Sequence, residues 1–139
     1  MTSADPANFF HFPIRVYYGD TDAGGIVYHA KYLEFAERCR SELMRSVGHP
    51  LISASGNQFV VREANVSWFH PARLDDLIII STAIRDTTGA RINMEHSFFL
   101  EEKMIVKISA QLAHVRQDGR PVRLDPSLIQ KMRTLRAEE

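Results

Sequence analysis

Hydrophobic residues near the start of the chain recur at every second position. Phe12, Ile14 and Val16 follow this step within residues 11–18. A period of two places these side chains on one face of an extended segment, so the pattern predicts a first β-strand. Residues 19–25 are polar and contain three glycines, which predicts a loop after that strand.

The hydrophobic period then changes to three and four residues, over residues 30–47. Positions with this spacing are Leu33, Ala36, Cys39 or Arg40, Leu43 and Val47. Such spacing forms one apolar stripe along an α-helix. Gly48 and Pro50 follow directly and are typical of a helix end. The pattern therefore predicts one long helix, with Cys39 on its core side.

The second half of the chain returns to strand-like segments joined by short turns. The predicted strands are residues 58–69, 77–85, 92–100 and 104–116. Residues 126–135 predict a short terminal helix. Consecutive strands with short connections favour an antiparallel sheet, and the single long helix is needed to cover its apolar face. We therefore expect one α+β domain over residues 1–139.

Composition narrows the possible classes of protein. The 17 basic and 17 acidic residues cancel, so the chain lacks the basic excess typical of nucleic-acid binders. Cys39 is the only cysteine, which excludes an intramolecular disulfide and suits a reducing compartment. The N-terminus lacks the pattern of a secretory signal, and the apolar run Leu77–Ile80 is too short to span a bilayer. We expect a cytoplasmic protein with no transmembrane segment and no nucleic-acid partner.

Small and polar residues are densest at Gly19–His29, between the first strand and the helix. Asp20 and Asp22 lie two residues apart, so their charges can interact, and Gly24 and Gly25 allow the backbone to approach a ligand. The helix begins just after this loop, and its free N–H groups can receive a developing negative charge. An Asp-x-Asp before a helix is also typical of a turn or a helix cap.

Three strings of this chain carry a family resemblance: VYYGDTDAGGIVYHAKY at Val16–Tyr32, FVVR at Phe59–Arg62 and ARLDD at Ala72–Asp76. In them the chain resembles the 4-hydroxybenzoyl-CoA thioesterase family, and more closely its YbgC-type branch of Tol-Pal-associated acyl-CoA thioesterases. The resemblance extends over roughly residues 12–130. It implies the hot-dog fold, a long central helix wrapped by a curved antiparallel β-sheet, and assembly as a homodimer or homotetramer.

Matched by position, the resemblance implies that Asp22 is the catalytic carboxylate and that His29 lies beside the active site. Main-chain N–H groups around Tyr28 and His29 would form an oxyanion hole, and Asp20 would orient the loop. Asp22 could activate a water as general base or attack the thioester as nucleophile, and the sequence leaves both routes open. His29 could position water, protonate the leaving thiolate or hydrogen-bond the loop.

The resemblance also implies a substrate: a short- or medium-chain acyl-CoA, hydrolysed to a free acid and coenzyme A. Whether acyl carrier protein is the natural donor stays open. Gly24, Gly25 and Arg91 are the expected substrate contacts, and Arg91 lies near a position where the family contacts the nucleotide. The basic run that precedes it in the aromatic-substrate enzymes is replaced here by Thr88–Ala90. An arginine at a strand end is more often a solvated surface residue, and this is the alternative interpretation of Arg91.

The sequence also allows another catalytic acid and other functions. Glu37 is the second candidate acid, because another hot-dog branch uses a helix glutamate; an ion pair with Arg38 or Arg40 is its alternative role. A non-catalytic acyl-CoA or acyl-carrier binding module is a second function, against which Asp22 and its glycine loop argue. A hot-dog hydratase or dehydratase is a third. The absence of G-x-S-x-G argues against a serine-triad hydrolase. The six histidines show no ligand-like spacing, so we expect no metal and no cofactor.

Overall fold

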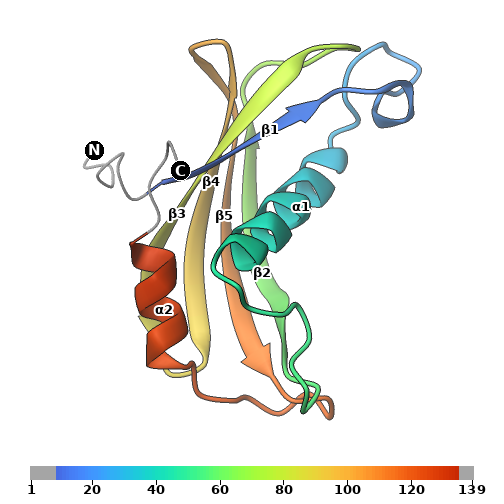
Figure 1. The fold of residues 1–139 in the computed structure, drawn as a ribbon. Coiled ribbons are helices and arrows are strands. Elements are labelled where there is room, and N and C mark those ends of the chain that lie inside the picture. Colours follow the sequence, from blue (N-terminus) through green and yellow to red (C-terminus); the bar gives the residue numbers. More distant parts are fainter. Residues whose placement is uncertain (1–8, 135–139) are drawn as a thin grey trace.

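The structure is a computed structural model that describes residues 9–134, in which two helices and a five-stranded antiparallel sheet are arranged in two layers (Figure 1). The strands are β1 (Phe10–Arg15), β2 (Gln58–Trp68), β3 (Leu77–Thr88), β4 (Arg91–Leu100) and β5 (Lys103–Val115). The helices are α1 (Lys31–Ser46) and α2 (Pro126–Arg133), and a short 3₁₀ helix, Tyr18–Asp20, precedes α1. The predicted end of the last helix, Leu135, lies outside the described residues.

The strands follow the order β1-β3-β4-β5-β2 across the sheet. All four pairings are antiparallel, as predicted. β2 pairs with β5 and not with β3, so two strands that are consecutive in the chain lie far apart in the sheet. The segment joining them instead contacts the loop before α1: Val27 N–H donates to the Ala72 carbonyl at 2.9 Å, and Val16 N–H to that of Asp76 at 2.9 Å.

Helix α1 lies across the concave face of the sheet (Figure 1). Its buried side chains are Tyr32, Phe35, Ala36, Cys39, Leu43 and Met44. The prediction that Leu33 belongs to this stripe was wrong, because Leu33 is 43% exposed. The buried face is rotated toward Tyr32, whose ring packs edge-on against Phe98 of β4 with centroids 5.5 Å apart. Gly48 ends the helix at φ +75°, a conformation that suits glycine.

Side chains in the centre of the sheet are more deeply buried than those of the edge strand β2. Ile92, Met94, His96 and Phe98 alternate along β4 and are at most 3% exposed, which confirms the predicted inner face. Every residue of β2 is exposed or half-buried, as befits a strand with a single neighbour. β3 runs to Thr88, three residues beyond the predicted end.

No helix within residues 9–134 has the length and apolar character needed to cross a membrane.

Candidate active site

A buried carboxylate organises the loop between β1 and α1. Asp20 is 8% exposed, and its Oδ2 accepts a hydrogen bond from Tyr17 N–H at 2.9 Å. Its main-chain carbonyl accepts from Tyr28 N–H at 3.0 Å, and Lys31 Nζ lies 3.7 Å from its Oδ1. Asp20 therefore joins the start of the loop to its end, which supports the loop-orienting role expected for it. The segment between these contacts carries Asp22.

Asp22 lies at the exposed tip of this loop. Its Oδ1 accepts from Gly24 N–H at 2.9 Å, while its main chain bonds to Ile26 and Gly25, each at 2.9 Å. Gly25 has φ +84°, so the turn requires a conformation that disfavours other residues. Oδ2 of Asp22 has no hydrogen-bond partner among the described residues. One carboxylate oxygen is thus fixed and the other is free to meet a water or a substrate.

His29 lies beside the end of β2. Its ring is 4.5 Å from that of Tyr28 and packs edge-on against Trp68 at 5.9 Å, measured between ring centroids. Trp68 Nε1 donates to the main-chain carbonyl of His29 at 3.1 Å. Neither ring nitrogen of His29 bonds to another described residue, so both face the surroundings. The edge strand therefore fixes the backbone of His29 and leaves its imidazole available.

Asp22 and His29 line the same open pocket, which has a volume of about 360 Å³. Its other lining residues are Ile26, Val27, Tyr32, Trp68, Phe69, His70 and Pro71. The structure thus brings together the two side chains singled out from the sequence. Sequence reasoning missed Trp68, Phe69 and His70 as part of the site. Their signal was an aromatic run that only Pro71 separates from the ARLDD string, in a segment that the sequence alone placed as a strand end and turn.

The main-chain donors near the start of α1 differ from those expected. Tyr28 N–H donates to the Asp20 carbonyl within the chain, so it is not free to bind an oxyanion. Lys31 N–H likewise donates to the Tyr28 carbonyl at 2.8 Å. The N–H groups of His29 and Ala30 have no acceptor among residues 9–134. Ala30 is the N-cap of α1, so these two donors lie at the positive end of the helix dipole.

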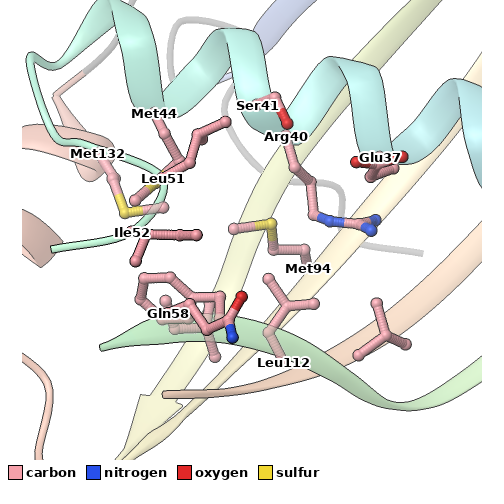
Figure 2. Close-up of a pocket in the computed structure, with 13 residues that line it drawn as sticks. Glu37, Arg40, Ser41, Met44, Leu51, Ile52, Gln58, Met94, Leu112 and Met132 are labelled. Carbon is pink, nitrogen blue, oxygen red and sulfur yellow. The ribbon is translucent and has the colours of Figure 1, made fainter. Parts of the chain in front are cut away.

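The remaining candidates lie apart from this pocket. Arg91 is exposed at the first position of β4, beside the turn from β3, and does not line the Asp22 pocket. Glu37 lines a different pocket, further along α1. It makes no ion pair within 4.0 Å with a described residue, so the expected pairing with Arg38 or Arg40 is absent. Arg40 instead turns inward (Figure 2), where its Nη1 contacts His96 Nε2 at 3.3 Å, and the guanidinium of Arg38 lies over the Phe35 ring, 5.9 Å from its centroid.

Cys39 belongs to the core, as predicted, and is fully buried. Burial raises the pKa of its thiol to about 11, with a contact to Thr82 acting in the opposite direction. The thiol therefore stays protonated and is a poor nucleophile. Among the residues the structure describes, no group of three or more His, Cys, Asp and Glu side chains is arranged to hold a metal ion.

The fold and this pocket define a thioester hydrolase: the family model of the thioesterase superfamily matches residues 24–107, and the chain belongs to that family. It is 40% identical over 111 residues to the acyl-CoA thioesterase YbgC of Haemophilus influenzae, covering 78% of this chain and 82% of the relative. The YbgC acyl-CoA thioester hydrolase of Escherichia coli O6:H1 is 41% identical over 106 residues, covering 70% and 79%.

Solved structures agree with this assignment. A probable thioesterase from Bartonella henselae superposes with a TM-score of 0.81 at 39% identity, covering 84% of this chain and 99% of that one. A 1,4-dihydroxy-2-naphthoyl-CoA thioesterase from Synechocystis shares the fold, with a TM-score of 0.82 at 18% identity. The predicted hot-dog fold and the predicted family are confirmed.

Proposed function

We propose that this protein hydrolyses acyl-CoA thioesters to a free acid and coenzyme A, with Asp22 as the catalytic carboxylate. One observation carries the proposal: Asp22, whose second carboxylate oxygen has no partner among the described residues, lines a single open pocket together with His29, just before α1 begins. The relatives named acyl-CoA thioesterases support the substrate class. Because Cys39 is a free thiol, the reducing cytoplasm is the compartment we propose.

The chemistry follows from these groups. Oδ2 of Asp22 deprotonates a water that attacks the thioester carbon, or attacks that carbon itself to form a mixed anhydride that water then cleaves. In both routes the carbonyl oxygen gains negative charge, which the N–H groups of His29 and Ala30 stabilise. The coenzyme A thiolate leaves with the electrons of the broken C–S bond. The imidazole of His29 can position the water or protonate this thiolate.

The preferred substrates in this proposal are short- and medium-chain aliphatic acyl groups, and acyl carrier protein is an alternative donor. The test measures thiol release from acyl-CoAs of increasing chain length and from the matching acyl-carrier-protein thioesters. We expect the highest kcat/KM on short or medium acyl-CoA. If the protein binds these thioesters but releases no thiol from any of them, the alternative of a non-catalytic acyl-CoA or acyl-carrier binding module is correct.

The same assay tests the roles of Asp22 and His29. Asp22→Asn removes the charge but keeps an oxygen that can accept from Gly24, so the loop geometry survives. We expect kcat/KM to fall by about 10²–10⁴-fold, and by less in His29→Ala, because the main-chain donors remain. Asp75→Asn is the matched control: Asp75 has φ +73°, which asparagine tolerates. An active Asp22→Asn beside an inactive His29→Ala would reverse the two roles.

We also propose that the protein works as a homodimer or a homotetramer. The outer edge of β2 has no strand partner among the described residues. The strand also exposes Val61 and Trp68, each 48% exposed, and is followed by Phe69 at 54%. Unpaired edges with exposed apolar side chains favour pairing with another chain. Trp68 and Phe69 line the Asp22 pocket, so a second copy at this edge would border the active site.

Sedimentation velocity at micromolar concentration tests this assembly. We expect a species of at least twice the mass of the chain. A monomer that retains full thioesterase activity would contradict the proposal.

A further inference from the structure

Trp68 joins the end of β2 to the residues that precede α1. It is the single tryptophan of the chain. Its Nε1–H donates to the main-chain carbonyl of His29 at 3.1 Å, although the two residues are 39 positions apart in the chain. Its ring also packs edge-on against the imidazole of His29, with the two ring planes at 81°. A hydrogen bond and a ring contact therefore hold together two residues that both line the Asp22 pocket.

The carbonyl that accepts this bond belongs to the same peptide group as Ala30 N–H. A peptide group is planar and trans, so its carbonyl and its N–H point in opposite directions and rotate together. Ala30 N–H has no acceptor among residues 9–134 and is one of the two donors of the proposed oxyanion hole. The indole bond to the His29 carbonyl therefore fixes the direction of one proposed oxyanion donor.

The two proposed donors are held in different ways. The peptide group that carries His29 N–H is held by the start of α1, because its carbonyl, that of Tyr28, accepts from Lys31 N–H at 2.8 Å. The peptide group that carries Ala30 N–H is held by the indole of Trp68. The first bond forms wherever the helix forms, whereas the second requires the sheet to place the end of β2 beside the loop. The direction of Ala30 N–H thus depends on tertiary structure.

We propose that Trp68 is a positioning residue, whose indole N–H orients the His29–Ala30 peptide group so that Ala30 N–H stabilises the negative charge forming on the thioester oxygen. A carbonyl that accepts a hydrogen bond also polarises the N–H of its own peptide group, which makes that N–H a stronger donor. This role rests on the proposed function, because it belongs to the proposed reaction. The bond between the indole and the carbonyl does not depend on it.

NMR detects the indole bond without any substitution and without substrate. Because the chain has a single tryptophan, ¹⁵N-labelled protein gives one indole N–H signal. Trp68 is 48% exposed, so burial alone gives this proton little protection. We expect it to exchange with solvent at least about tenfold more slowly than the indole proton of N-acetyltryptophanamide at the same pH. Equal exchange rates would show that the bond is absent and would overturn the proposal.

Steady-state kinetics on Trp68→Phe test what the bond does in the proposed reaction. Phenylalanine keeps an aromatic ring beside His29 but has no N–H to donate. Complete loss of an oxyanion donor lowers kcat by about 10²–10³-fold, and a donor that is present but misdirected should cost less. We expect kcat to fall about tenfold and KM to stay within about twofold of wild type, because this donor acts mainly on the charge of the transition state.

Val60→Thr is the matched control on the same strand. Val60 is 39% exposed and lines neither the Asp22 pocket nor the pocket of Glu37, so kcat and KM should match those of wild type. Circular dichroism confirms the fold of each variant. Sedimentation velocity confirms its assembly, since Trp68 lies at the edge where a second copy is proposed.

A second replacement tests the N–H group alone. Benzothienylalanine, inserted at position 68, has a ring of nearly the same shape as indole, with sulfur in place of the N–H. It should lower kcat as Trp68→Phe does, and it replaces that variant in the test should Trp68→Phe change the fold or the assembly.

The outcomes separate positioning from pocket lining. A raised KM with unchanged kcat in these variants would show that Trp68 only shapes the pocket, and would overturn the proposal. Slow indole exchange together with unchanged kinetics would also overturn it, because the bond would then stabilise the loop alone. If wild type releases no thiol from any acyl-CoA, the proposed function fails and the role of Trp68 fails with it, whereas slow indole exchange would still demonstrate the bond.

Discussion

Charged side chains at the two ends of α1 lie in opposite environments, one exposed to solvent and one turned toward the core. At the N-terminal end, the carboxylate of Asp22 is exposed, and one of its oxygens has no partner among the described residues. At the C-terminal half, Arg40 turns inward and contacts a neutral, fully buried histidine. Each end packs on its own part of the core, one around Phe98 and one around Leu112. In the proposed reaction Asp22 must meet water and substrate, whereas Arg40 contacts a side chain of the folded chain and can be partly desolvated.

The largest effect should come from removing the charge of Asp22, compared with removing the charge of Arg40. Asp22→Asn should lower kcat/KM on acyl-CoA by about 10²–10⁴-fold, because it removes the reacting charge. Arg40→Met should lower it by less than about tenfold, because Arg40 does not line the pocket that contains Asp22. Steady-state kinetics on both variants check this. A loss in Arg40→Met as large as that in Asp22→Asn would end the distinction between the two pockets.

The second-largest effect concerns the pH dependence of stability, which reports how well the region around Arg40 and His96 excludes water. The pKa of His96 is about 3 in the folded protein and about 6.5 in an unfolded chain. The unfolded state therefore binds more protons in this window, and stability falls as pH drops from about 6.5 toward 3. At pH 5 the loss from this residue is about 2 kcal/mol.

Urea unfolding of wild type and His96→Gln at pH 7.5 and pH 5 measures that loss. The variant should lose about 2 kcal/mol less than wild type on acidification. His11→Gln, at an exposed position of β1, serves as the control and should behave as wild type. Equal pH dependence in His96→Gln and wild type would mean that His96 is solvated.

A smaller effect concerns the glycines that shape the Asp22 turn. Gly25→Ala should lower the free energy of unfolding by about 1–2 kcal/mol, because φ is +84° there. At Gly24 an added Cβ would lie 3.2 Å from Asp22 Oδ1, so Gly24→Ala should displace the carboxylate and reduce kcat several-fold. Gly19→Ala meets nothing within 4 Å and is the control. Thermal unfolding and kinetics together separate the two effects.

The smallest effect is expected at Cys39. Its thiol is fully buried with a pKa near 11, so a thiol reagent should modify the folded protein far more slowly than the protein in urea. Cys39→Ala should keep kcat/KM within about twofold of wild type, since the side chain is remote from the reacting atoms. Rapid modification accompanied by loss of activity would place this thiol near the active site.

Local patterns predicted most of the fold. The period of two in β4 and the Gly48 stop after α1 depend on neighbours within a few residues, and both predictions held. Leu33 was placed wrongly because the spacing of apolar residues permits more than one stripe. The contact between Tyr32 and Phe98 selects which stripe faces the sheet, and these two residues are far apart in the chain.

The site was predictable in part for the same reason. Asp22 and His29 lie in one loop, so a single motif carries both, and the structure places them in one pocket. Trp68 joins that pocket because β2 pairs with β5 at the edge of the sheet. Nothing near Trp68 in the chain indicates which loop it will contact. The ion pair expected for Glu37 fails because Arg40 turns inward toward His96, 56 residues away.

By itself, the sequence determined the family, the helix and strands, and the loop that presents Asp22, because these depend on residues close together in the chain. Only the tertiary structure decided which groups lose water. It ties Tyr28 N–H to Asp20 and leaves the next two donors without an acceptor among residues 9–134. It also buries His96 and part of Arg40 against β4 and so creates a second pocket. Desolvation depends on every neighbour at once, and those neighbours come from segments that meet only when the sheet closes around α1.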